Sequence, residues 1–256
     1  MKKWLNGFCA AFSMYSTVPM PQIQWREDTM RYLFCFFPWI GLLTGGLCLG
    51  WAWFCRAWQV GALLFAGGMT LLPLIVSGGI HLDGLVDTAD ALYSRRETEK
   101  KLEILKDPHV GAFGVMACCG YLLASFALWG QVYETPRLIG LCCIGFFLSR
   151  CCSALAVVSF PAAKNSGLAH LFSSYADKKT VRVCCGFYLL LAGALLVWKL
   201  LWLGAAVLIT IGFVFVGFWH LCRKQFGGIT GDLAGFFLQV AELAVLAVCT
   251  FGGIMG

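Results

Sequence analysis

The chain has 256 residues, of which 60% are hydrophobic and only 12% are charged. Soluble domains carry roughly a quarter charged residues, so this composition excludes an ordinary soluble protein. The formal net charge of +6 is not gathered in a soluble basic module with exposed aromatic residues, and nothing in the sequence indicates nucleic-acid binding.

The first 31 residues contain no stretch that is long and apolar enough to cross a membrane. The apolar stretch Trp4–Val18 is short, and Pro19 and Pro21 follow it. We therefore expect an interfacial or re-entrant segment here. A cleaved signal peptide is the less favoured alternative, because polar residues interrupt the stretch and no small-x-small cleavage site follows it.

From residue 32 to residue 256 the sequence predicts an all-α, polytopic membrane bundle, because apolar runs of roughly 20 residues recur. The seven predicted spans are Tyr32–Trp53, Val60–Ile80, Gly111–Val132, Leu138–Phe160, Val183–Val197, Leu201–Trp219 and Leu233–Met255. The fifth and sixth are separated only near Lys199, so we take six to eight spans as the range. Residues 1–256 are interpreted as one membrane-embedded catalytic domain.

Basic residues are distributed unevenly between the two sides of this bundle. Fifteen Lys and Arg residues lie before the first, third, fifth and seventh spans, whereas the alternate connections hold three, Arg56, Arg137 and Lys199. Because positive residues favour cytoplasmic loops, we predict a multi-pass protein of the cytoplasmic (inner) membrane with a cytoplasmic N-terminus. The long polar connections, and any site built from them, then face the cytoplasm. Some of the basic charge also suits anionic membrane lipid.

The most informative segment is His81–Asp90, directly after the second predicted span. Asp83, Asp87 and Asp90 are spaced four and three residues apart, so on a helix they share one face. Repulsion among three carboxylates at the end of a span is relieved by a divalent cation. Oxygen ligands suit Mg²⁺, Mn²⁺ or Ca²⁺ better than Zn²⁺. We therefore predict that these carboxylates hold metal ions for catalysis.

Two interpretations of this segment stay open. The acidic stripe would also fit a solvated face that is paired with Arg95, Arg96 or Lys100. His81 precedes Asp83 by two residues, so a continuous helix turns it away from the carboxylates, whereas an extended chain would bring it into the site. There it would orient a carboxylate, contact a phosphate or act as a base; a structural histidine at a helix end is the alternative.

A second polar segment, beginning at Lys106, stands at the start of the third predicted span. Asp107 suits the N-cap of that helix, and Pro108 suits its first turn. Capping alone is one interpretation. The functional interpretation adds Lys106 and His109 as phosphate contacts, because helix N-termini favour anions.

A third polar stripe runs into the last predicted span. Asp232, Gly235, Gln239 and Glu242 recur at helical steps, and Glu242 lies about 15 Å deeper along the axis than Asp232. Arg150, within the fourth predicted span, is the candidate counter-charge for Glu242. Such a pair would be structural or would line a substrate cavity.

Taken together and in this order, these segments resemble the cobalamin synthase family, the adenosylcobinamide-GDP ribazoletransferases, over nearly the whole chain. The motifs that carry the resemblance are Phe12–Pro19, His81–Asp90, Lys106–Gly114, Ser166-Gly167-Leu168, and Gly227–Gly235 with Gln239 and Glu242. Ser16 and Thr17 stand where the first motif of the family commonly has an Arg, so that one contact departs from the pattern.

The resemblance implies a Mg²⁺-dependent transferase of cobalamin biosynthesis in the cytoplasmic membrane. It would join adenosylcobinamide-GDP to α-ribazole or its 5′-phosphate, and yield adenosylcobalamin or its 5′-phosphate together with GMP. Other cobalamin-assembly enzymes and a second copy of the chain are further partners that we consider.

For this chemistry we expect Asp83, Asp87 and Asp90 to hold the metal, with Asp232 as a fourth ligand. One of the carboxylates or His81 would take the hydroxyl proton. The expected substrate-binding residues are Lys106, Asp107, His109, Arg95, Arg96, Thr230, Gln239 and Arg150.

Two alternatives belong to other families or classes. A CDP-alcohol phosphotransferase needs Asp-Gly-x-x-Ala-Arg, and here Val86 and Asp87 replace the Ala-Arg pair. A multi-pass transporter would use Asp87, Arg150 and Glu242 as an ion path. The gathering of charge at one face and the lack of paired broken half-helices disfavour a transporter.

Overall fold

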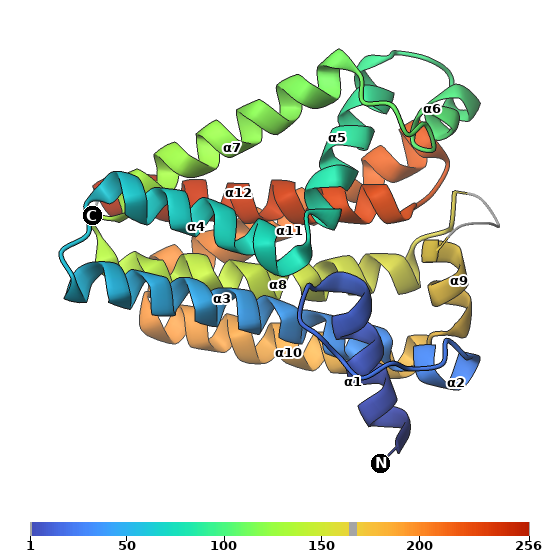
Figure 1. The fold of residues 1–256 in the computed structure, drawn as a ribbon, viewed down its shortest axis with the longest axis horizontal. Helices are drawn as coiled ribbons and strands as arrows, with labels where there is room; N and C mark the ends of the chain where they lie inside the picture. The colour runs from blue at the N-terminus through green and yellow to red at the C-terminus, as the bar shows by residue number, and fades with distance from the viewer. Residues whose placement is uncertain (1, 164–167, 256) are drawn as a thin grey trace.

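A computed structural model describes residues 2–163 and 168–255, and within these residues the protein is helical, with a single isolated bridge between extended residues (Figure 1). The elements in chain order are α1 (Lys2–Tyr15), α2 (Glu27–Met30), α3 (Leu33–Ala57), α4 (Ala62–Ser77), α5 (Ile80–Tyr93), α6 (Thr98–Ile104), α7 (Ala112–Val132), the 3₁₀ turn η1 (Pro136–Leu138), α8 (Ile139–Ser159), α9 (Leu168–Tyr175), α10 (Lys178–Lys199), α11 (Leu201–Phe226) and α12 (Gly231–Met255).

The long helices run side by side as a bundle (Figure 1). Within the described residues, six helices are long and apolar enough to cross a membrane, namely α3, α7, α8 with η1, α10, α11 and α12. A seventh span arises if the bent pair of α4 and α5 is counted as one. The predicted all-α membrane bundle of six to eight spans is therefore confirmed.

Helix α8 occupies the centre of the bundle, and glycines of α3 allow its backbone to approach closely. A Cβ atom on Gly41 would lie 2.3 Å from the carbonyl oxygen of Phe146. On Gly45, one turn further along, it would lie 2.8 Å from the carbonyl oxygen of Cys143. Close contact through small residues is how helices pack where water is absent and apolar burial alone cannot drive association.

The prediction of the second span, Val60–Ile80, is wrong in one respect. The chain turns sharply before Ile80 instead of continuing as one helix. Helix α4 ends at Ser77, and α5 starts at Ile80 with its axis bent by 93°. Gly78 and Gly79 make this turn with φ of +63° and +80°, values that residues with a Cβ rarely adopt. The acidic helix α5 therefore crosses the end of the bundle instead of continuing the direction of α4 (Figure 1).

The N-terminal helix α1 is not among the helices that could span a membrane, which agrees with the predicted interfacial segment. It packs against α3, and Trp4 stacks on Tyr32 with ring centroids 4.6 Å apart. The following turn is held to α4, because the Thr17 N–H donates to the Val76 carbonyl over 2.8 Å.

The two ends of the bundle differ in the length of their connections. The segments that contain α2, α5, α6 and α9 gather at one end, and the short connections lie with the C-terminus at the other (Figure 1). The long polar connections, which carry most of the Lys and Arg residues, therefore lie at one end of the bundle, as the sequence predicts. At the first end, the Ile229 N–H donates to the Pro161 carbonyl over 2.8 Å, and this bond ties the start of α12 to the end of α8. Ser166 and Gly167 of the predicted Ser-Gly-Leu motif lie outside the described residues.

Candidate active site

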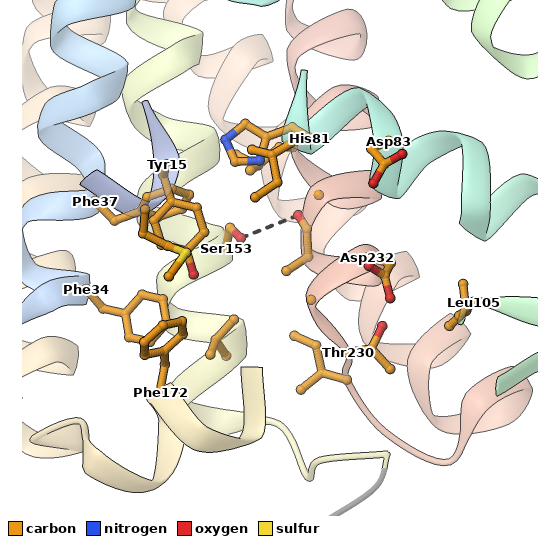
Figure 2. A pocket seen from close by; sticks show the side chains of 18 of the residues that line it. Tyr15, Phe34, Phe37, His81, Asp83, Leu105, Ser153, Phe172, Thr230 and Asp232 are labelled. Carbon is orange, nitrogen blue, oxygen red and sulfur yellow. Dashed lines mark hydrogen bonds between the residues drawn. The ribbon is translucent and has the colours of Figure 1, made fainter. Parts of the chain in front are cut away.

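A cavity of about 290 Å³ lies at the end of the bundle that α5 crosses (Figure 2). Predicted site residues from three separate stretches of chain line it. Asp83 is on α5, Lys106 follows α6, and Thr230 and Asp232 stand at the start of α12. His81, the first-turn neighbour of Asp83 on α5, also lines the cavity. Five predicted site residues from three stretches of chain thus border one space.

Two glycines explain why α5 and α12 meet so closely here. A Cβ on Gly84 would lie 2.5 Å from the backbone oxygen of Asp232. A Cβ on Gly235 would lie 3.2 Å from the backbone oxygen of His81. Any larger side chain at Gly84 would separate the two helices, and with them the Asp83 and Asp232 carboxylates.

The acidic stripe exists as predicted, with Asp87 within electrostatic range of Asp83, Asp90 and Asp232. Among the described residues, however, no three acidic, histidine or cysteine side chains converge closely enough to form a metal cluster. Mg²⁺ is usually held by one or two carboxylates together with phosphate oxygens and water. Asp83 and Asp232, which line the cavity from opposite helices, have the oxygen donors that this mode of binding needs.

Asp90 has a different environment from the other carboxylates of the stripe. Its two oxygens accept hydrogen bonds from the backbone N–H groups of Gly111, over 2.7 Å, and Gly114, over 2.8 Å. Asp90 thereby caps α7 from a position 21 residues earlier in the chain. A Cβ on either glycine would lie within 2.5 Å of an Asp90 oxygen, which explains both glycines of the Lys106–Gly114 motif.

The interpretation of Asp107 as the N-cap of the third span is therefore wrong. Helix α7 starts only at Ala112. Asp107 instead accepts hydrogen bonds from the backbone of His109 over 2.9 Å and from its ring over 2.8 Å. These bonds lower the pKa of Asp107, the backbone bond contributing most. The two residues form an exposed turn beside the cavity.

Five further residues that were predicted to bind substrate fall into two groups. Lys106 and Thr230 line the cavity. Arg95, Arg96 and His109 are exposed on the connection between α5 and α7 and are not among the lining residues.

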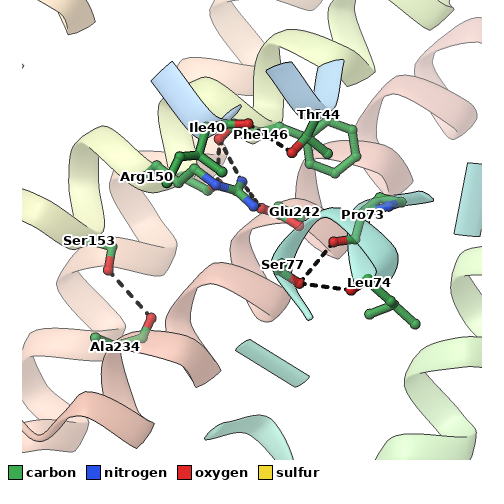
Figure 3. A network of polar contacts seen from close by, with 11 residues as sticks. Ile40, Thr44, Pro73, Leu74, Ser77, Phe146, Arg150, Ser153, Ala234 and Glu242 are labelled. Carbon is green, nitrogen blue, oxygen red and sulfur yellow. Dashed lines mark hydrogen bonds and ion pairs between the residues drawn. The ribbon is translucent and has the colours of Figure 1, made fainter. Parts of the chain in front are cut away.

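The predicted pair of Arg150 and Glu242 is confirmed, but it lies inside the bundle rather than at the cavity (Figure 3). The Arg150 guanidinium lies 2.6 Å from Glu242 Oε1, and the side chains are 1% and 5% exposed. Ser149 Oγ also donates to Glu242 over 2.9 Å, and Arg150 donates to the Phe146 carbonyl. Gln239 is likewise buried and does not line the cavity.

Sequence reasoning missed the aromatic side of the cavity. Tyr15, Phe34, Phe37 and Phe172 line it, together with Ser153 on α8. Tyr15, Phe34, Phe37 and Ser153 lie within apolar runs, where the sequence offers no signal that separates a cavity wall from a membrane-facing or core residue. Phe172 lies in the connection between the fourth and fifth predicted spans, where no motif singles it out.

A helical membrane bundle with carboxylates and a lysine around a cavity at one end defines a polytopic membrane protein equipped to bind a phosphate ester. The chain matches the family described as cobalamin-5-phosphate synthase over residues 7–250, and it belongs to that family.

Curated relatives cover nearly the whole chain. The adenosylcobinamide-GDP ribazoletransferase of Lachnoclostridium phytofermentans is 40% identical, over 99% of this chain and 97% of its own length. The protein of that name from Desulfitobacterium hafniense is 34% identical, over 92% and 93%. The one from Clostridium botulinum is 30% identical, over 98% and 100%. No solved structure matches the chain.

Proposed function

We propose that this protein joins adenosylcobinamide-GDP to α-ribazole or its 5′-phosphate and releases GMP. Membership of the family and the names of the relatives support the reaction. The observation that carries it in the structure is the meeting of Asp83, Lys106 and Asp232 around one cavity, because a diphosphate substrate needs both cationic and metal-binding groups.

The reaction breaks a phosphoanhydride bond of the diphosphate and forms a phosphate ester bond. A ribose hydroxyl of the acceptor forms a bond to the phosphorus that carries the cobinamide. The bond between that phosphorus and the GMP oxygen breaks, and GMP leaves with the electron pair. The hydroxyl proton passes to a base of the protein. The candidates are His81 and a carboxylate of the acidic cluster, which consists of Asp83, Asp87 and Asp232.

The residues of the cavity match these needs. The Lys106 ammonium would hold a phosphate oxygen, and the Thr230 hydroxyl would donate to a second. Asp83 and Asp232 would hold Mg²⁺, with Asp87 adding negative charge behind them. When bound, Mg²⁺ neutralises the diphosphate and stabilises the leaving oxygen.

We further propose that the protein lies in the cytoplasmic membrane and that its site faces the cytoplasm. The cavity lies at the end of the bundle where the long, lysine- and arginine-rich connections gather (Figure 1). Positive loops favour the cytoplasmic side, and nucleotide substrates are available there.

Purified protein in detergent tests the proposal. We expect GMP release from adenosylcobinamide-GDP to require both an acceptor and Mg²⁺, and to stop when a chelator is added. Parallel assays with α-ribazole and its 5′-phosphate identify the preferred acceptor. Solute flux in liposomes without any turnover would contradict the proposal and favour a transporter.

A further inference from the structure

The aromatic side of the cavity has no part in holding the diphosphate or the metal ion. Tyr15 from α1, Phe34 and Phe37 from α3 and Phe172 from α9 gather on one side, and Asp83, Thr230 and Asp232 stand on the other (Figure 2). Phe34 and Phe172 are each only 2% exposed, so their rings face protein and cavity rather than lipid or water.

We propose that this side binds the benzimidazole base of α-ribazole, and that His81 hydrogen-bonds the free nitrogen of that base. The inference rests on the proposed function, since it assigns a place to one of the two substrates.

The size of the cavity favours the smaller substrate. Sites for small molecules usually enclose about 300–1,000 Å³. A volume of about 290 Å³ stands at the lower end of that range and suits a two-ring base with its ribose. A corrin ring with its side chains is far larger, so the cobinamide lies outside the cavity.

The shape and chemistry of the walls favour a flat aromatic occupant. Aromatic rings attract each other in offset or edge-to-face arrangements, and each such pair adds to the effect of apolar burial. Tyr15 and Phe37 also surround His81, with ring centroids 6.2 and 5.9 Å from its imidazole.

His81 supplies the polar contact that an otherwise apolar wall lacks. Its side chain lines the cavity and is 3% exposed, and its Nε2 atom has no hydrogen-bond partner among the described residues. A buried polar group without a partner is unfavourable, and a ligand that pairs with it gains accordingly. The base of a benzimidazole riboside has one nitrogen bonded to ribose and one with a free lone pair, which accepts a hydrogen bond from an imidazole N–H.

The base and the ribose of the nucleoside then match the aromatic and the acidic side of the cavity in turn. With the base among the aromatic rings, the ribose extends toward Asp83 and Asp232. Its hydroxyl thus arrives where the diphosphate is held. Since His81 holds the base in this arrangement, the hydroxyl proton passes to a carboxylate.

The first experiment changes one atom of the substrate and one side chain of the protein. In the test analogue, the free ring nitrogen of α-ribazole is replaced by CH. We expect wild-type enzyme to prefer α-ribazole by about 100-fold in kcat/KM, because a site that hydrogen-bonds a group rejects the analogue without it. In His81→Phe the preference should fall to within about threefold, and His81→Gln, which keeps an N–H donor, should restore part of it.

A preference that persists in His81→Phe overturns the role of His81. So does a fall in kcat alone with an unchanged preference, which would make His81 the catalytic base.

The second experiment fills the aromatic side. Val157 on α8 lines the cavity, whereas Val207 on α11 is also buried but does not line it. We expect Val157→Phe to raise the KM for α-ribazole about tenfold and to change the KM for adenosylcobinamide-GDP less than twofold. Val207→Phe is the matched control and should change neither KM. If Val157→Phe does not fold, the smaller change Val157→Met serves, with an expected rise of about threefold.

A rise in the KM for adenosylcobinamide-GDP instead would place guanine or the corrinoid in this space and overturn the proposal. Direct binding separates this inference from the proposed function. If wild-type protein releases no GMP, the function fails. Titration of the donor-free, full-length protein with α-ribazole, compared between wild type and Val157→Phe, then still decides whether the aromatic side binds the base.

Discussion

The acidic cluster at the end of the bundle and the Arg150–Glu242 network within it contrast in how their charges are balanced. In the network, opposite charges lie 2.6 Å apart, and Ser149 and a backbone carbonyl add further hydrogen bonds. Among the described residues, Arg150 Nε and Glu242 Oε2 have no hydrogen-bond partner. In the cluster, the three side chains of Asp83, Asp87 and Asp232 are all acidic, and no salt bridge joins them to a cation within the described residues.

The difference indicates which region is built for stability and which for a ligand. In a buried pair of opposite charges, each partner neutralises the other, so no ion from solution is needed to balance the charge. Like charges held together are unfavourable until a cation arrives, and arrangements of this kind concentrate at functional sites. Substitutions in the two regions should therefore differ in what they change, activity in the acidic cluster and stability in the network.

Removing a carboxylate from the cluster should abolish activity without loss of stability. For Asp83→Asn and Asp232→Asn we expect GMP release to fall by about 1,000-fold, since a metal ion contributes several kcal/mol of charge stabilisation. The thermal midpoint in the absence of metal should stay the same or rise, because repulsion decreases. Full activity in either purified variant would contradict the assignment of metal ligands.

Removing one partner of the buried network should reduce stability, in contrast to the substitutions in the acidic cluster. Glu242→Ala leaves the Arg150 guanidinium buried without a counter-charge, and we expect a loss of about 3–5 kcal/mol in stability. The double variant Arg150→Met with Glu242→Leu should be markedly less destabilised, because no charge remains buried. Thermal unfolding in detergent measures both. A stable but inactive Glu242→Ala protein would instead move this pair into the substrate site.

Asp90 offers a test between the two regions, because it belongs to the acidic stripe yet has protein partners. Asp90→Ala removes the cap of α7, and we expect a loss of about 0.5–2 kcal/mol in stability together with a partial loss of activity. Complete inactivity at unchanged stability would show that Asp90 binds metal, as its spacing suggests. The thermal midpoint and the rate of GMP release, measured on the same preparation, separate the outcomes.

The smallest effect is expected at the exposed pair of Arg31 and Asp177, which lie 2.8 Å apart at the end of the bundle. The hydrogen bond from Arg31, followed by that from the Thr180 backbone, lowers the pKa of Asp177 from 3.8 to about 2. A lowered pKa means that the contribution to stability is present above pH 4 and is lost as the pH falls from 4 toward 2. Asp177→Asn should remove this part of the acid sensitivity, as measured by thermal midpoints between pH 5 and pH 2.5. An unchanged pH profile would show that the pair contributes nothing.

The sequence by itself determined the membrane class, the approximate number of spans, the asymmetry of charge and the shared face of the three aspartates. These follow from composition and helical periodicity, which act over a few neighbouring residues. The pairing of Arg150 with Glu242 was also predictable, because two opposite charges in apolar spans have few alternatives to each other.

Only the tertiary structure decided how the stripe is used. Asp83 and Asp90 are equivalent by spacing, but α12 approaches one and the start of α7 covers the other. The 93° turn at Gly78 and Gly79 and the close contact at Gly84 created that difference. The aromatic side of the cavity also could not be predicted, because the sequence does not distinguish an aromatic residue that faces lipid from one that faces the core or a ligand. What separates these cases is contact between distant segments, which no local pattern encodes.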